Sequence, residues 1–420
     1  MNVESEVRRR IQERGKITFA AFMEVALYWS QGGYYTGREP VGAVGDYYTS
    51  PAVHPAFGAL MAVQLYQMWQ VMDRPAIFTA LELGAGNGLL CRDITDYAAQ
   101  LPDGFAKSLH YVCLDRRSVT RVEQRGSSIG RVLSDVVPFR GLEGCVLSNE
   151  YLDAFPVHQV VMTNDGLKEV YVGLEGDNLV ELTDKLSNPA LESRLKDLGI
   201  TLVEGQTAEI NLRLAPWANG VAGALERGFV LTIDYGRTAR DLYHAEQRAR
   251  GTLVTYHQHV QTDSPLTRIG SQDITAQVDF TSVEAVGRRA GLGTLGLVTQ
   301  RKFLSQLGLG YLQQHVIKQS PTPRQAQANM AGISDLVRPG GLGDFKVMIQ
   351  AKNVGTPALW GLEQSPGPIG LVEGLPVPVL TDDHLSLTDA RYPGAETEFE
   401  AFWQVTESEG SDESGIPPVA

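Results

Sequence analysis

The chain contains 420 residues, of which 43% are hydrophobic, and it carries a formal net charge of −13 at pH 7. This length is enough for one large domain or two smaller ones. The negative charge argues against a nucleic-acid partner, whose phosphates it would repel. No apolar run approaches the roughly 20 residues of a membrane-spanning helix. More than half of the charge imbalance is local, because residues 396–420 contain seven carboxylates and no lysine or arginine.

The amino terminus and the cysteines indicate a cytoplasmic protein. Residues 1–15 mix glutamates with arginines and resemble neither a signal peptide nor an acid-poor transit peptide. The three cysteines are too widely spaced for a zinc site and too few for a disulfide framework. A reducing, cytoplasmic location is therefore expected, while the composition predicts no particular oligomeric state.

Two helices are predicted in the first 75 residues. The first begins after Thr18, which can cap it, and runs to about Tyr28. The second begins near Pro55, since proline suits a first helical turn. Between them, residues 32–51 are rich in glycine and aromatic side chains and are expected to form an ordered loop. Residues 1–75 are therefore interpreted as an amino-terminal helical cap.

From residue 76 onward, short apolar runs alternate with helical segments, which predicts an α/β fold with a doubly wound, Rossmann-like parallel sheet. Strands are expected at 77–83, 109–114, 144–148, 229–233 and 345–350. Residues 76–352 would form this core, with insertions at about 165–225 and 237–300. Residues 353–420 are rich in proline and glycine and then in acids, so they are expected to be a loosely attached extension, disordered from about 405.

The strand at 77–83 leads into a glycine-rich loop, LELGAGNG at 81–88, which opens a helix and presents backbone N–H groups to a ligand. Its glycines are Gly84, Gly86 and Gly88. The third glycine of a dinucleotide fingerprint would fall at Leu89. The carboxylate of Glu82 would repel a pyrophosphate but attract an ammonium. These features favour S-adenosylmethionine, which has an ammonium, a sulfonium and no phosphate, over a nicotinamide dinucleotide or a ligand-free turn.

Other side chains complete the predicted donor site. Asp115, at the end of its strand, is placed to accept hydrogen bonds from ribose hydroxyls, and Asp135 to receive the adenine amino group. Asp46 and Tyr35 are candidates to close over the donor, since an aromatic face attracts a sulfonium. A packing role for the tyrosines of this region is an equal alternative.

Three polar residues follow the strand at 144–148, where methyl acceptors usually lie in this fold. Glu150 and Asp153 can share one face of a helical turn, and if the acceptor is a guanidinium they would pair with its planar fork. Asn149 can orient the acceptor through its amide oxygen. The alternative is that Glu150 caps a helix and Asp153 is solvated. Asp234, at a further strand end, suits either a general base or a residue that fixes a turn.

Two histidines, His257 and His259, would share one face of a strand and invite a metal interpretation. No further ligand follows nearby, with Asp263 and Asp273 only loose candidates. No metal site is predicted, and hydrogen-bonded loop histidines are expected instead.

Together these motifs resemble the MidA-like family of S-adenosylmethionine-dependent methyltransferases. The resemblance spans about residues 10–352 and includes ITFAAFM at 17–23, GYY at 33–35, GDYYTSP at 45–51, LELGAGNG at 81–88 and NEYLDAFP at 149–156. Its mitochondrial members are protein-arginine methyltransferases that act in assembly of respiratory complex I, so the resemblance implies a protein substrate presenting arginine. The amino terminus lacks the composition of an import sequence, so a bacterial-type relative is expected and the complex I substrate is not carried over.

Three alternatives stay open at this point. A small-molecule methyltransferase would use the same donor site, and an assembly or scaffold protein would bind S-adenosylmethionine without turnover. A nicotinamide oxidoreductase is disfavoured by Leu89 and Glu82.

Overall fold

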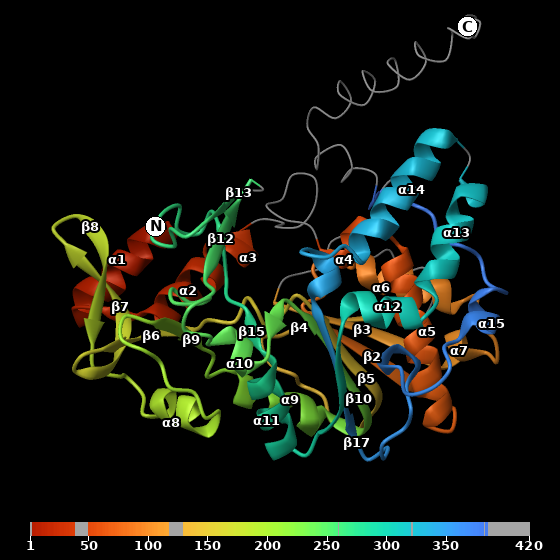
Figure 1. Cartoon of the computed structure of the whole chain (residues 1–420), viewed down its shortest axis with the longest axis horizontal. Coiled ribbons are helices and arrows are strands. Elements are labelled where there is room, and N and C mark those ends of the chain that lie inside the picture. The colour runs from red at the N-terminus through yellow and green to blue at the C-terminus, as the bar shows by residue number, and fades with distance from the viewer. Residues whose placement is uncertain are drawn as a thin grey trace, which may run out of the picture.

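The computed structural model describes residues 2–37, 49–116, 129–258, 260–320, 322–381 and 383–384. Two bodies lie side by side, a larger one around a central sheet and a smaller one that holds the amino-terminal helices (Figure 1). The predicted roles of Asp46 and His259, and the disorder expected from residue 405, lie outside the described residues.

A seven-stranded sheet forms the centre of the larger body. In spatial order its strands are β16 (Gly293–Thr299), β17 (Lys346–Lys352), β10 (Leu225–Asp234), β5 (Leu142–Asn149), β2 (Phe78–Leu83), β3 (Leu109–Asp115) and β4 (Ile129–Leu133). Neighbouring strands from β10 to β4 pair in parallel. The α/β, Rossmann-like fold is therefore confirmed.

The expectation of a wholly parallel sheet is wrong at one edge. Strand β17 is antiparallel to both of its neighbours, β10 and β16. The apolar pattern of a buried strand is the same in either direction, so it does not reveal strand polarity. Strand β16 lies in the segment that was expected to be the second insertion. Its residues are mostly only half-buried, so its sequence lacks the continuous apolar run that marks a central strand.

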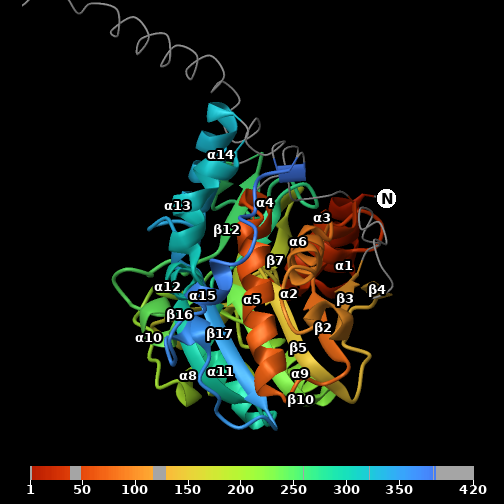
Figure 2. The same cartoon turned by 90° about the vertical axis from the view of Figure 1, so that its right-hand side faces the viewer.

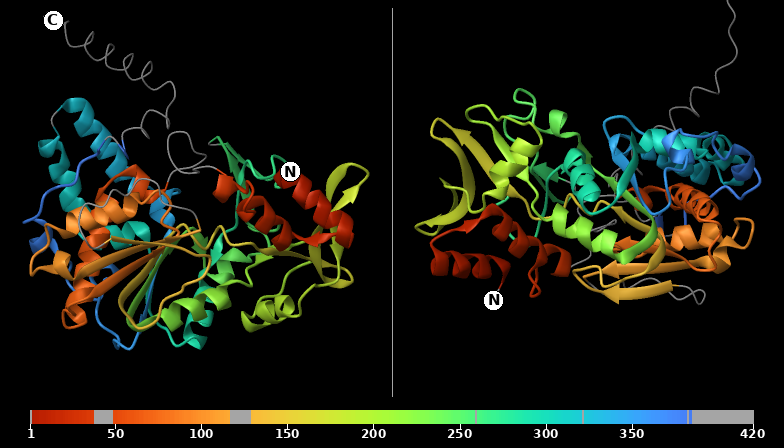
Figure 3. Two further views of the ribbon diagram at one scale, coloured as in Figure 1. Left: turned by 180° about the vertical axis from the view of Figure 1, so that it is seen from behind. Right: turned by 90° about the horizontal axis from the view of Figure 1, so that it is seen from below.

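Helices cover both faces of this sheet (Figures 2 and 3). One face packs against α5 (Ala56–Val71), α6 (Leu89–Ala98), α7 (Phe105–Ser108), α12 (Gln300–Gln306), α13 (Leu309–Gln319) and α14 (Pro323–Leu336). The other face packs against α9 (Leu214–Ala224) and α11 (Phe280–Arg289). Along β5 the two cores receive alternate side chains, with Cys145 and Leu147 on one face and Val146 on the other, as the period of two in a strand requires.

The smaller body joins the amino-terminal helices to a second sheet. This sheet contains β1 (Ile17–Thr18), β7 (Gly166–Glu175), β6 (His158–Thr163), β9 (Thr207–Ile210) and β8 (Asn178–Asp184), with α8 (Ala190–Asp197) beside it. Helices α1 (Val3–Arg14) and α2 (Phe19–Tyr28) pack on it around the buried Phe19 and Phe22. The predicted cap of α2 is confirmed, because Ala21 N donates to Thr18 Oγ1 over 3.1 Å.

Further short elements complete the described part of the fold. They are α3 (Tyr34–Gly37), α4 (Ser50–Val53), β11 (Gly236–Arg237), α10 (Ala239–Leu242), β12 (Val254–His257), β13 (Val260–Thr262), β14 (Asp273–Thr275), β15 (Val278–Asp279) and the 3-10 turn η1 (Leu342–Asp344). In the part of the chain that the structure describes, no helix has the length and apolar character needed to cross a membrane.

The segment that follows β17 is not loosely attached, contrary to the expectation for residues from 353. It contains the 3-10 turn η2 (Trp360–Leu362) and α15 (Ile369–Val372), and Leu359 and Val372 are fully buried in the main core. Trp360 N and Gly361 N donate to side chains of α5, over 2.8 and 3.0 Å respectively. In a segment so rich in proline and glycine, the sequence did not reveal that a few apolar residues would be buried in the core.

Removing one anchor should therefore cost stability. We expect Leu359→Ala to lower the free energy of unfolding by about 2–4 kcal/mol, because it leaves a cavity in the core. Leu133→Ala is a matched control, since Leu133 is 63% exposed. Urea denaturation of both variants measures the difference, and equal stabilities would show that the segment is not part of the folded core.

Candidate active site

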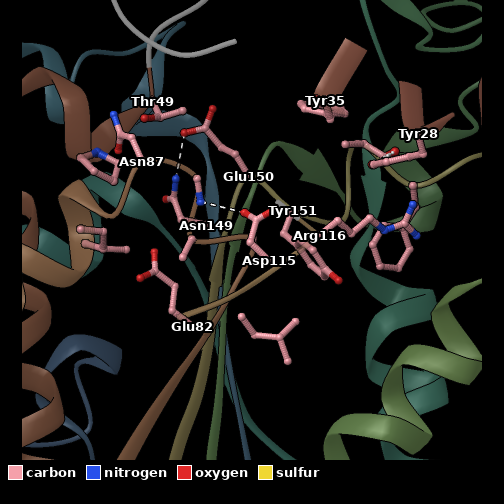
Figure 4. Close-up of a pocket in the computed structure, with 18 of the residues that line it drawn as sticks. Tyr28, Tyr35, Thr49, Glu82, Asn87, Asp115, Arg116, Asn149, Glu150 and Tyr151 are labelled. Carbon is pink, nitrogen blue, oxygen red and sulfur yellow. Dashed lines mark hydrogen bonds between the residues drawn. The ribbon is translucent and has the colours of Figure 1, made fainter. Parts of the chain in front are cut away.

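A pocket lies beyond the carboxyl ends of β2, β3 and β5, between the central sheet and α2 (Figure 4). Parallel strands bring their carboxyl ends to one edge, which is where such sheets bind ligands. Most of the predicted site residues line this pocket: Tyr35, Glu82, Gly84, Gly86, Asp115, Asn149 and Glu150. Gly88, Asp135 and Asp153 are not among its lining residues.

The glycine loop has the left-handed backbone that its sequence requires. Gly84, Gly86 and Gly88 have φ values of 71°, 55° and 79°, a region that only glycine enters without strain. A Cβ on Gly84 would lie 2.6 Å from Cδ2 of Tyr151, whereas one on Gly86 meets no atom within 4 Å. Gly88 precedes the first turn of α6, so it shapes the loop and does not line the pocket.

A hydrogen bond joins Asp115 to this loop at the carboxyl-terminal edge of the sheet. Its Oδ2 accepts a hydrogen bond of 2.9 Å from Gly86 N, which fixes the loop against the end of β3. The side chain of Asp135 is exposed and does not line the pocket, where Ser134 lies instead. Neighbouring residues at a strand end point to opposite sides, and the spacing of the sequence alone did not show which of the two faces the pocket.

Glu82 places a buried carboxylate at the floor of the pocket. It is 4% exposed, and its Oε2 accepts a hydrogen bond of 2.9 Å from the Tyr111 hydroxyl. Burial and, to a smaller extent, the charge of Asp115 raise its pKa to about 8, against the lowering effect of the Tyr111 hydrogen bond. A cation bound beside it would favour the ionised form. The open loop and this carboxylate therefore fit the ammonium of an amino-acid nucleoside.

The residue after β5 has an unusual backbone. Glu150 has φ of +50°, a conformation that a non-glycine residue adopts at a cost of roughly 1–3 kcal/mol and that is common at functional sites. Its Oε1 accepts hydrogen bonds from Asn149 Nδ2, over 3.0 Å, and from Ser50 N, over 3.3 Å. Burial raises the pKa of Glu150 to about 8, and the charge of Asp153 adds to the effect.

Asp153 lies on the turn that follows Glu150. Residues 151–155 form turns and bends and not a helix, so Glu150 does not cap a helix, and Asp153 is largely enclosed by protein. Burial raises the pKa of its carboxyl group. Among the described residues, its Oδ1 and the Oδ1 of Asn149 are buried without a hydrogen-bond partner. Two acceptor oxygens are thus available beside Glu150.

Asp234 fixes this turn, which decides between the two roles that the sequence left open. Its Oδ2 accepts from Tyr151 N and Leu152 N, over 3.1 and 2.8 Å, and its Oδ1 accepts from Tyr235 N over 2.8 Å. A carboxylate that accepts three backbone hydrogen bonds acts as a structural anchor. Asp234 therefore holds the backbone on which Glu150 and Asp153 are carried.

An aromatic and basic wall, of which only Tyr35 was predicted, lines the pocket together with the glycine loop. The rings of Tyr28 and Tyr35 stack with centroids 5.4 Å apart, and the Arg116 guanidinium lies 4.2 Å from the Tyr28 ring centroid. Arg213 also lines the pocket and pairs with Glu24 of α2 over 2.8 Å. Tyr28, Arg116 and Arg213 are far apart in sequence, and no local motif marks them.

The histidine pair gives no metal site in the described part of the chain, where no group of three or more His, Cys, Asp or Glu residues is arranged to hold an ion. His257 Nδ1 lies 2.8 Å from the carbonyl oxygen of Ser271. His259 is outside the described residues.

Comparison with known proteins connects this geometry to chemistry. A family described as "Putative S-adenosyl-L-methionine-dependent methyltransferase" matches residues 60–298, more than half of the chain. The mitochondrial protein arginine methyltransferase NDUFAF7 homolog of Drosophila melanogaster is 28% identical over 332 residues, covering 72% of this chain and 74% of that protein. Human mitochondrial protein arginine methyltransferase NDUFAF7 is 26% identical over 369 residues, covering 80% of each chain.

A solved structure supports the same assignment. A superfamily member from Burkholderia thailandensis, bound to S-adenosyl-homocysteine, is 27% identical with a TM-score of 0.77 and covers 87% of this chain and 95% of its own. The family resemblance inferred from the motifs is confirmed, S-adenosylmethionine is the cofactor, and the nicotinamide alternative is set aside. With its glycine loop and buried acid at the ends of parallel strands, this chain belongs to that family of S-adenosyl-L-methionine-dependent methyltransferases.

Proposed function

We propose that the enzyme methylates a guanidino nitrogen of arginine in a protein substrate. The observation that carries the proposal is the carboxylate of Glu150 in the pocket lining, with Asp153 three residues later, whose Oδ1 is buried without a hydrogen-bond partner among the described residues. The names of the Drosophila and human relatives, both protein arginine methyltransferases, support it. A cytoplasmic location, consistent with three free buried cysteines, also stays a proposal.

For the donor, we assign the glycine loop and the acids of the first two strands. The backbone at Gly84 and Gly86 would hold the amino-acid part, with Glu82 beneath its ammonium, and Asp115 would hold the ribose. Tyr35, on the opposite wall, would cover the sulfonium. When bound, S-adenosylmethionine supplies an electrophilic methyl group on that sulfonium. Asp135, exposed in the structure, is left out of this assignment.

At the proposed acceptor site, the acids reduce the electrostatic repulsion between two bound cations. A guanidinium beside a sulfonium places two positive charges in a site of low dielectric, and ionised Glu150 and Asp153 reduce that repulsion. Asn149 Oδ1 can accept a hydrogen bond from the acceptor and orient its nitrogen in line with the methyl group. Each transfer releases one proton from the acceptor nitrogen, and Glu150, whose pKa is about 8, is placed to receive it.

The direct test is incubation with isotopically labelled S-adenosylmethionine and peptides containing arginine, lysine or neither, followed by mass spectrometry. Label on arginine nitrogens supports the proposal. Label confined to small molecules of an extract would favour a small-molecule methyltransferase, and donor binding without any transfer would favour a scaffold.

Donor binding should depend on Gly84. In Gly84→Ala the new Cβ displaces the Tyr151 ring, 2.6 Å away, so we expect affinity for S-adenosyl-homocysteine to fall roughly tenfold or more, the loss that about 1–3 kcal/mol of overpacking implies. Gly104→Ala is a matched control, because Gly104 also has positive φ but faces open space outside the pocket. Calorimetric titration compares them, and equal affinities would refute the donor assignment.

Turnover should depend on Glu150. We expect Glu150→Gln to reduce kcat/KM by about 10²–10⁴-fold, the usual contribution of a positioned acid or base, with unchanged affinity for S-adenosyl-homocysteine. Glu143→Gln, on the same strand but paired with Arg227 at its far end, should be near wild type. Undiminished turnover in Glu150→Gln would remove Glu150 from the mechanism.

The pH dependence should report the same group. Since the ionised form of Glu150 is the one that binds a cation and accepts a proton, kcat/KM should rise with pH and level off above about 8. A profile that is flat between pH 6 and 9 would contradict this role. The profile of Glu150→Gln should lack the rise.

A further inference from the structure

We propose that Asp273, in β14 of the second insertion, is a third carboxylate of the acceptor site and binds the guanidinium together with Glu150 and Asp153. This inference rests on the proposed arginine acceptor and deepens it. From the sequence, Asp273 is only a loose metal candidate near the histidine pair, and it lies 120 residues after Asp153 along the chain.

The position of Asp273 is set by contacts on two sides. Its Oδ1 accepts hydrogen bonds from the Tyr35 hydroxyl, over 2.8 Å, and from Ile274 N, over 2.9 Å. Tyr35 itself lines the donor pocket. Three residues later, Ala276 N donates to the carbonyl oxygen of Asp153 over 3.1 Å. The segment that carries Asp273 is thus bonded both to the pocket wall and to the acceptor turn.

The three acids lie close enough to interact electrostatically. Tyr256 pairs directly with Asp273 between β12 and β14. The pKa of Tyr256 is raised mainly by burial and then by the nearby Tyr235, and the charges of Asp153, Asp273 and Glu150 raise it as well. Asp273 also contributes to the raised pKa of Glu150. Carboxylates enclosed together repel one another and are costly to ionise unless a cation is bound among them.

Two buried oxygens near these acids lack hydrogen-bond partners in the described part of the chain, which indicates that the compensating cation is a bound ligand. Asp153 Oδ1 and Asn149 Oδ1 are buried without a partner among the residues that the structure describes, whereas buried polar atoms are usually hydrogen-bonded. A guanidinium has five N–H donors in one plane, so it can satisfy acceptors on several sides at once. An ammonium lacks this fixed planar geometry, so the arrangement favours arginine over lysine.

The test is Asp273→Asn, which removes the charge but keeps an Oδ1 acceptor for Tyr35 and Ile274. We expect the KM for an arginine-containing peptide to rise tenfold or more, while affinity for S-adenosyl-homocysteine changes less than twofold. Asp263→Asn makes the same charge change at an exposed position of the same insertion and should leave both quantities unchanged. If Asp273→Asn does not fold, Asp273→Ser, which keeps a hydroxyl acceptor, takes its place.

A second readout excludes a purely structural role. Glu150 faces Asp153, Asp273, Asn149 and the backbone N–H of Ser50, so loss of the Asp273 charge should lower its pKa. The acid limb of the kcat/KM profile should therefore shift to lower pH in Asp273→Asn.

The outcomes separate this inference from the function on which it rests. If the wild-type enzyme methylates arginine peptides and Asp273→Asn changes neither KM nor the acid limb, Asp273 is not an acceptor-binding residue and the proposed function stands. If the wild-type enzyme binds S-adenosyl-homocysteine but neither methylates arginine peptides nor binds L-arginine amide by calorimetry, the proposed function fails and this inference with it.

Discussion

The hydrogen bonds from Tyr151 N and Leu152 N to Asp234 are the constraint on which the site depends. They hold the turn after β5, where Glu150 adopts a left-handed backbone and Tyr151 packs against the glycine loop. Donor loop and acceptor acids are thereby fixed to one another through a single buried carboxylate. In-line methyl transfer needs this fixed relation, because small errors in placement cost much of the rate.

Charge balance explains why so many acids are buried here. Burial raises the pKa of Glu82 and Glu150 to about 8, and a cation bound beside each carboxyl would favour its ionised form. The donor brings an ammonium and a sulfonium, and the proposed acceptor brings a guanidinium. Under the proposed function, each of these acids would have a cationic group beside it.

The smaller body adds side chains to the site that the central sheet of this widespread fold forms. The central sheet supplies the glycine loop and the strand ends, while α2, α3 and β14 supply Tyr28, Tyr35 and Asp273. The Tyr28 hydroxyl donates to the carbonyl oxygen of Ala154 over 2.7 Å, which joins the amino-terminal helices to the acceptor turn. The pocket is therefore lined both by the common core and by segments outside it.

The sequence by itself determined the donor loop, the α/β class and the acids Asp115 and Glu150, because each follows directly after its strand and parallel strands bring such positions to one edge. Only the tertiary structure decided the direction of β17, the exposure of Asp135 and the hydrogen bond between Tyr35 and Asp273. Strand polarity, side-chain direction at a strand end and contacts between distant segments arise from packing, and packing joins residues that no local pattern relates.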